Sequence, residues 1–142
     1  MITAVWATPI PEDARRIREQ IFVQEQGFCA QTEFDSLDDT VEHIVLYDGT
    51  QPIATGRVID DGDGVFHFGR IAIIKAYRGS GLGRFLMRHL EQKALQLGAK
   101  IFLVGAQVRA QDFYEKCGYR CCGAEYMDEH VPHVSMKKNA SF

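Results

Sequence analysis

Hydrophobic spacing changes from that of strands to that of a long helix at a glycine-rich segment (RGSGLG, residues 78–83), and this change limits the fold more than any other feature. Before that segment, short apolar runs over 43–74 are separated by two turns rich in Asp and Gly, which predicts a meander of three antiparallel strands. After it, apolar side chains recur at helical spacing over 82–97. This order excludes all-α and all-β folds and predicts a mixed α/β domain.

Shorter patterns complete the predicted order of elements. A helix is expected to begin at Pro11 and end at Gly27, because proline suits the first helical turn and glycine suits the residue after the last. The other predictions are an edge strand at 2–6, a loop with one helical turn at 32–42, a buried strand at 101–104, a helix at 110–117 and final strands at 119–126 and 133–136. No repeat or linker interrupts them, so residues 1–142 are predicted to form one domain.

Composition narrows the class of protein. The 142 residues are 46% hydrophobic and 25% charged, which is typical of a globular chain that can bury a core. The formal net charge of −3 argues against a nucleic-acid partner. No apolar run reaches the length of a membrane span, and no basic segment precedes an apolar stretch at the N-terminus. We therefore expect a cytoplasmic protein with no membrane partner.

The cysteines are expected to be reduced and free of metal. They are Cys29, Cys117, Cys121 and Cys122. Two of them are adjacent, and neighbouring strand residues point to opposite faces, so a shared disulfide or metal site is awkward. A zinc site that adds His130 and His133 matches no familiar ligand spacing. The sequence therefore predicts no bound metal.

Charge is distributed unevenly along the chain. Residues 19–56 hold eight acidic and no basic residues, whereas residues 57–122 hold eleven basic and six acidic residues. An excess of acids can attract a cationic ligand. Four acids of the first stretch are therefore predicted to orient a cationic amine: Glu33, Asp35, Asp38 and Asp39. The alternative is a solvated acidic face with no role in substrate binding.

The segment 78–84 has the features of a phosphate-binding loop. Its three glycines let the backbone approach a ligand closely, and the following helix offers unpaired N–H groups and the positive end of its dipole. Arg78 and Arg84 flank the loop and can pair with phosphate oxygens. The nucleotide P-loop motif is absent, and the dinucleotide fingerprint fails because Arg84 stands at its last glycine. A pyrophosphate ligand is favoured, and a structural tight turn is the alternative.

Two motifs in this half of the chain resemble those of the GNAT superfamily of N-acetyltransferases. Residues 78–83 resemble its acetyl-CoA signature, Q/R-x-x-G-x-G/A, and residues 113–119 (FYEKCGY) resemble its F-Y-E-K-x-G-F stretch at a fitting distance. The resemblance covers roughly residues 50–138, and residues 17–43 look like one subgroup of uncharacterised bacterial members. Gln107 departs from the pattern, because many members carry Asn there, but either amide can bond to the cofactor.

The resemblance implies a GNAT-like acyl-CoA N-acyltransferase fold: an α/β (mixed α+β) domain with a central, mostly antiparallel mixed sheet flanked by helices. The strand at 65–74 should splay from the strand at 100–105, with the pantetheine arm of CoA in the gap. The implied co-substrate is acetyl-CoA, released as coenzyme A, and a homodimer is compatible with the family. The implied cofactor-binding residues are Ile71, Ala72, Ile73, Arg78, Gly79, Ser80, Gly81, Leu82, Gly83, Arg84 and Gln107.

The implied reaction is direct attack of a primary amine on the thioester, and it needs an acid and a base. Tyr114 matches the family's tyrosine acid, and a phenol that is protonated at neutral pH can donate to the leaving thiolate. The attacking amine must be neutral, and the two candidate bases are His43 and Glu33. His67 and Glu125 also remain open.

The sequence leaves other functions open. Fold alone does not establish catalysis, so a non-catalytic acyl-CoA sensor on the same fold is one alternative. A nucleotide-binding regulatory domain is another, although the failed phosphate motifs disfavour it. Tyr114 favours the enzyme, unless its side chain is only a core aromatic on a helix face.

Overall fold

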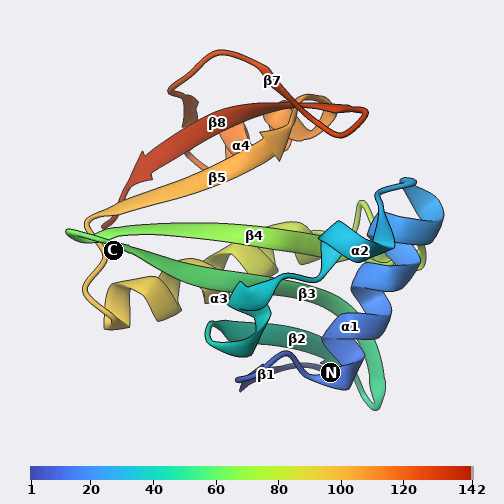
Figure 1. The fold of residues 1–142 in the computed structure, drawn as a ribbon. Coiled ribbons are helices and arrows are strands. Elements are labelled where there is room, and N and C mark those ends of the chain that lie inside the picture. Colours follow the sequence, from blue (N-terminus) through green and yellow to red (C-terminus); the bar gives the residue numbers. More distant parts are fainter. Residues whose placement is uncertain (142) are drawn as a thin grey trace.

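The computed structural model describes residues 1–141, whose strands form one mixed sheet (Figure 1). In sheet order the strands are β1 (Ile2–Ala7), β2 (Glu42–Asp48), β3 (Gln51–Gly62), β4 (Val65–Ile73), β5 (Ile101–Gln107), β8 (Val131–Asn139) and β6 (Arg120–Cys121), and β7 (Tyr126–Asp128) pairs with β8. The pairs are antiparallel except β4 with β5, which are parallel. The predicted meander of β2, β3 and β4 and the mostly antiparallel mixed sheet are confirmed.

Helices cover both faces of this sheet. The helical elements are α1 (Glu12–Arg18), its π-helical continuation η1 (Glu19–Glu25), α2 (Ala30–Glu33), η2 (Ser36–Asp39), η3 (Lys75–Tyr77), α3 (Leu82–Gln96), η4 (Val108–Ala110) and α4 (Gln111–Lys116). Gly56 and Arg57 of β3 show which elements lie on which face, because neighbouring strand residues point to opposite faces of the sheet. A Cβ on Gly56 would lie 3.3 Å from Leu90 of α3, whereas Arg57 bonds to Asp38 of η2. Thus α3 packs on one face, and η2 lies on the other.

The sheet opens between β4 and β5. Their parallel pairing runs from Val65–Ile101 to Phe68–Val104 and stops there, and beyond it the two strands diverge (Figure 1). A register shift in β4 lies at the same place, where Arg70 adopts a φ of +52° in the left-handed region. A bulge of this kind bends and twists its strand, and bulges are common next to functional sites. The splay that the family resemblance implies is therefore present.

The C-terminal strands differ from their predicted boundaries. The expected strand at 119–126 is reduced to the two residues of β6 and the first residue of β7, whereas β8 extends well beyond 133–136 in both directions. Residues 121–130 are all exposed. Without a buried apolar face, nothing fixes a long strand there, whereas β8 buries His133, Val134 and Met136 along its pairing with β5.

Residues 1–141 show neither a membrane span nor a metal cluster. No helix of this part of the chain is long and apolar enough to cross a bilayer. Its four cysteines are unpaired, and three of them are exposed. Over the same residues, no group of three or more His, Cys, Asp or Glu side chains is placed to hold a metal ion.

Candidate active site

A cavity of about 920 Å³ lies where β4 and β5 separate. Its wall includes residues 69–73 of β4, Gly105 and Gln107 of β5, and Tyr114 of α4. Small-molecule sites usually have volumes of roughly 300–1,000 Å³, so this cavity has the size of a ligand site. Because β5 pairs with β4 only as far as Phe68, the β4 edge beyond it lacks a partner strand within residues 1–141 and can bond to an extended ligand.

The glycine-rich loop lies at one end of this cavity and has an open backbone. Gly79 and Gly81 both line the cavity and have φ values of +77° and +85°, which favour glycine. A Cβ on either would meet no atom within 4 Å. Helix α3 begins at Leu82, and no side chain of residues 1–141 caps its N-terminus. Open space beside uncapped N–H groups fits the pyrophosphate of a CoA-type ligand.

The third glycine of the motif also has a packing role. A Cβ on Gly83 would lie 2.9 Å from the ring of Phe113, so this glycine lets α4 approach the start of α3. Gly83 lines the cavity, but two predicted cofactor-binding residues, Ser80 and Leu82, do not. The Ser80 hydroxyl donates to the Tyr77 carbonyl over 2.5 Å, and the Leu82 side chain is buried in the core. The rest of the predicted cofactor set lines it.

Both arginines of the loop are engaged by protein groups. The Arg78 guanidinium donates to both carboxylate oxygens of Glu25 over 2.6 and 3.0 Å, and its Nε donates to the Ile73 carbonyl over 2.9 Å. Arg84 donates to the Lys116 carbonyl over 2.7 Å. Each side chain lines the cavity, so each can reach a ligand there.

Tyr114 is buried on helix α4 with its side chain against the cavity. It makes edge-to-face contacts with Phe113 and Tyr119, whose ring centroids lie 5.1 and 6.0 Å away. Burial raises the pKa of Tyr114, with a smaller contribution from the neighbouring Cys117. The hydroxyl therefore stays protonated at neutral pH and can only donate its proton, not remove one.

The two predicted bases occupy different environments. His43 is 1% exposed and lies outside the cavity, with its Nε2 3.1 Å from the Asp38 carbonyl oxygen. Burial lowers the pKa of His43. A base must reach the attacking amine, so this position argues against His43 in that role. Glu33 does line the cavity, but its carboxylate is buried and lies 3.0 Å from Arg18 and 3.1 Å from Arg70.

A histidine that the sequence left as an open alternative lies in a better position. His67 of β4 lines the cavity, and its Nδ1 is 2.6 Å from the carboxylate of Asp61. A carboxylate can only accept, so Nδ1 holds the hydrogen and the neutral ring keeps a lone pair on Nε2. No sequence motif marks this pair, because the Asp61 side chain reaches His67 only across the turn between β3 and β4. Glu125, the other open alternative, is exposed and does not line the cavity.

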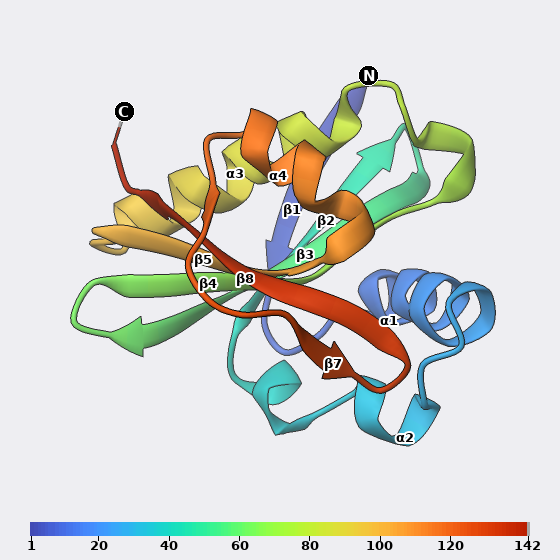
Figure 2. The ribbon, with the colours of Figure 1, turned by 90° about the horizontal axis from the view of Figure 1, so that it is seen from above.

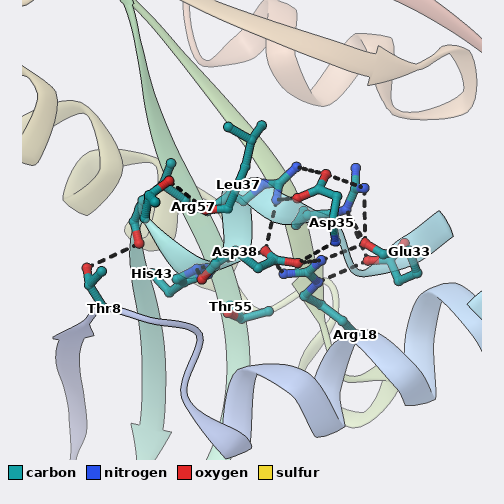
Figure 3. Close-up of polar contacts among 12 residues, drawn as sticks. Thr8, Arg18, Glu33, Asp35, Leu37, Asp38, His43, Thr55 and Arg57 are labelled. Carbon is teal, nitrogen blue, oxygen red and sulfur yellow. Dashed lines mark hydrogen bonds and ion pairs between the residues drawn. The ribbon is translucent and has the colours of Figure 1, made fainter. Parts of the chain in front are cut away.

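Charged side chains beside the cavity form a compact ionic cluster (Figure 3). Its members are Arg18, Glu33, Asp35, Asp38, Arg57 and Arg70. Asp38 lies at its centre and accepts from Arg18, Arg57 and the Asp35 backbone over 2.7–3.0 Å. The three arginines and three acids balance one another, and they fix the α2–η2 segment against β3 and β4.

This cluster changes the interpretation of the acidic stretch at 19–56. Three of the four acids predicted to orient a cationic amine belong to the ionic cluster, and only Asp39 is exposed. Arg57 and Arg70 come from the basic stretch that follows, Arg18 comes from just before the acidic one, and Glu25 likewise pairs with Arg78. The sequence excess of acids is therefore largely neutralised in space. It gives no independent support for a cationic acceptor.

Replacing the central acid should destabilise the fold. We expect Asp38→Asn to lower the free energy of unfolding by about 3–5 kcal/mol, because the amide NH₂ would face N–H donors and leave two buried arginines short of a counter-charge. That loss is a large part of a typical total stability of about 5–15 kcal/mol. Urea titration of the purified variants measures it. Asp39→Asn removes the same charge from an exposed position and should change stability by less than about 0.5 kcal/mol.

The same carboxylate predicts a pH dependence. Burial alone would raise the pKa of Asp38, but the bonds from Arg18 and the Asp35 backbone and the charges of Arg18 and Arg57 lower it to about 2. The stabilisation from Asp38 is then complete above about pH 4 and is lost as the pH falls towards 2. Asp38→Asn should lack this part of the acid transition. Equal pH slopes in the variant and the wild type between about pH 4 and 2 would contradict the assignment.

The site defines a class of protein. An open glycine loop before an uncapped helix, a free β4 edge and a buried tyrosine around one cavity are the features expected of an acyl-CoA N-acyltransferase. Comparison with known proteins agrees: residues 12–140 match the family model "Acetyltransferase (GNAT) domain". The chain belongs to the GNAT acetyltransferase family.

Individual relatives support the same assignment. The uncharacterised N-acetyltransferase YjcF of Bacillus subtilis is 41% identical over 130 residues, which cover 90% of this chain and 91% of YjcF. The crystal structure of a Lactobacillus plantarum protein described as an N-acetyltransferase is 36% identical, with a TM-score of 0.91 and 99% of each chain covered. An acyl-CoA N-acyltransferase from Pseudomonas aeruginosa is 26% identical, with a TM-score of 0.85, and the match covers 97% of this chain and 99% of that one.

Proposed function

We propose that this protein transfers an acetyl group from acetyl-CoA to a primary amine. The observation that carries the proposal is that the glycine loop, the free edge of β4 and the Tyr114 side chain line one cavity. A phosphate-binding loop alone would suit a sensor of acyl-CoA. A buried, protonated hydroxyl on the same cavity adds the proton donor that a leaving thiolate needs.

The proposed reaction uses groups on both sides of the thioester. The amine nitrogen attacks the carbonyl carbon, a C–N bond forms and the C–S bond breaks. Tyr114 donates to the departing sulfur, while a base takes the proton that the nitrogen loses. We assign the base role to His67, because Asp61 fixes its tautomer and leaves Nε2 free to accept a proton. Glu33 is less suited, because Arg18 and Arg70 already hold its carboxylate.

A cationic acceptor is supported by acids other than those of the 19–56 stretch. Asp128 at the end of β7 and Glu129 after it line the cavity with the aromatic rings of Phe28 and Tyr126. Among residues 1–141, the Glu129 carboxylate accepts only neutral hydrogen bonds, from the Cys29 backbone and the Thr32 hydroxyl, so its charge has no paired cation there. Acids beside aromatic rings suit an amine that carries a second positive charge on an apolar body. We therefore propose polyamines, aminoglycoside-like amines and basic peptide ends as the first acceptors to test.

The test of the function is release of CoA thiol from acetyl-CoA, measured over a panel of amines. The panel should pair cationic acceptors with neutral and zwitterionic amines of similar length. We expect amine-dependent thiol release, fastest with a cationic acceptor. Tight acetyl-CoA binding without turnover for any amine would instead indicate a sensor, and a neutral or anionic amine as the best acceptor would contradict the proposed substrate class.

The base assignment makes a separate prediction. His67→Gln should lower kcat/KM by about 10²-fold or more, because the amide cannot take a proton from the amine. Asp61→Asn should cause a smaller loss, because it removes only the carboxylate that orients the ring. Steady-state kcat/KM with the best amine measures both effects. His89→Gln, on α3 and outside the cavity, is the control, and a kcat/KM in His67→Gln equal to that of His89→Gln would exclude His67 as the base.

A further inference from the structure

Two consecutive residues at the end of the π-helix η1, Glu25 and Gln26, cross the opening between β4 and β5. On the β4 side, Glu25 accepts both bonds of the Arg78 guanidinium. On the β5 side, the Gln26 side-chain oxygen accepts from Gln107 over 2.8 Å. The Gln26 backbone carbonyl also lies 2.7 Å from His130 Nε2, near β8, and Figure 2 shows this helix end beside β7 and β8.

These contacts engage the polar groups that the cofactor is expected to use. Arg78 is expected to pair with phosphate and Gln107 to bond to the cofactor through its amide, and both line the cavity. The Ile73 carbonyl, on the β4 edge expected to bond pantetheine, already accepts from Arg78 Nε. The Arg78–Glu25 pair therefore occupies both a phosphate partner and a backbone partner of the ligand.

The Glu25 carboxylate resembles a phosphate in the way it binds. It presents two oxygens to the fork of one guanidinium, which is the arrangement that Arg also forms with phosphate. The two side chains are 37% and 38% exposed, so water screens the pair and a stronger anion can displace the carboxylate. The Arg78 guanidinium cannot make the same two hydrogen bonds to the Glu25 carboxylate and to a phosphate at once.

We propose that Glu25 and Gln26 form a strap that holds the empty cofactor site, and that the pyrophosphate of CoA displaces Glu25 from Arg78. The strap rests on the proposed function, because it assumes that the ligand is an acyl-CoA. Displacement removes the contact that holds the end of η1 on the β4 side, and the residues after it lead into α2 and so to Glu33 of the ionic cluster. Cofactor binding and the acceptor side of the cavity are thereby linked through one segment.

The test is equilibrium binding of CoA to the full-length protein by isothermal titration calorimetry. A ligand that binds only when the strap is open has an apparent Kd equal to its intrinsic Kd divided by the open fraction, so a closed strap weakens binding. Glu25→Gln removes the competing charge, so the Kd for CoA should fall roughly two- to fivefold. Pantetheine has no phosphate to compete with the Glu25 carboxylate, so its Kd should change less than that of CoA. Glu19→Gln, at the other end of η1 and without an ion pair among residues 1–141, should leave the Kd for CoA unchanged.

A second measurement follows the strap itself. CoA should speed hydrogen–deuterium exchange of residues 19–28 in the wild type, while it slows exchange in the loop at 78–84. The strap would be overturned if the Kd for CoA of Glu25→Gln were no lower than that of the wild type, or if Glu19→Gln lowered it equally. Slower exchange at residues 19–28 on binding CoA would also overturn it. Failure of the wild type to bind CoA at all would overturn the proposed function and the strap with it.

Discussion

Gly81→Asp should weaken CoA binding by at least about 10²-fold while the protein stays folded. The new carboxylate would stand where the pyrophosphate is expected, and like charges about 4 Å apart repel by a few kcal/mol near a protein surface. The fold should tolerate the change, because a Cβ on Gly81 meets no atom within 4 Å. Asp is also among the residues that adopt the left-handed region most readily, and Gly81 has a φ of +85°. Calorimetric titration with CoA measures the loss.

A second glycine provides a matched control for the backbone cost. Gly49 lies in the turn between β2 and β3, has a φ of +62°, and a Cβ on it would also meet no atom within 4 Å. It does not line the cavity. Gly49→Asp should therefore carry a similar conformational cost and bind CoA like the wild type. If both variants bind CoA equally well, the pyrophosphate does not lie on this loop.

Tyr114→Phe should lower kcat by about 10²-fold, with little change in the Kd for CoA. General acid catalysis contributes roughly 10²–10⁴-fold, and the raised pKa of Tyr114 makes it a weaker acid, so the lower end of that range is expected. The ring and its contacts with Phe113 and Tyr119 remain, so the fold should be preserved. Single-turnover measurement of thiol release isolates the chemical step.

Tyr119, which packs against Tyr114, provides a control that distinguishes a catalytic effect from a loss of stability. The Tyr119 hydroxyl donates to Glu91 over 2.7 Å, and Tyr119 does not line the cavity. Tyr119→Phe should lower stability by about 1 kcal/mol through the lost hydrogen bond and leave the rate of the chemical step unchanged. A chemical step in Tyr114→Phe as fast as in Tyr119→Phe would remove Tyr114 from the mechanism.

Local patterns are enough to predict most of the fold. Apolar spacing and Asp-Gly turns predict β2, β3, β4 and α3 close to their observed bounds, because strand and helix periods differ and turn residues mark where each element ends. The same dependence on apolar spacing makes the end of the chain hard to predict. Residues 121–130 are exposed, so no periodic apolar face records their conformation.

The candidate site is only partly predictable. The loop at 78–84 and Tyr114 belong to contiguous motifs, and most of the predicted set lines the cavity. The base is not predictable in the same way: His43 follows an acidic stretch in the sequence, yet it is buried outside the cavity. Nothing in the sequence pairs His67 with Asp61, because a hydrogen bond between side chains leaves no periodic pattern.

Most of the elements, the glycine loop and the family follow from the order of residues alone, because they depend on near neighbours and on motifs of fixed spacing. Which charges remain free depends instead on the folded arrangement. The sequence shows an acidic stretch and a basic one, but Arg18, Arg57 and Arg70 meet the acids in a buried cluster, and Glu25 meets Arg78 across the cavity. The energy of a charge depends on its distance from other charges and on its burial, and chain order specifies neither.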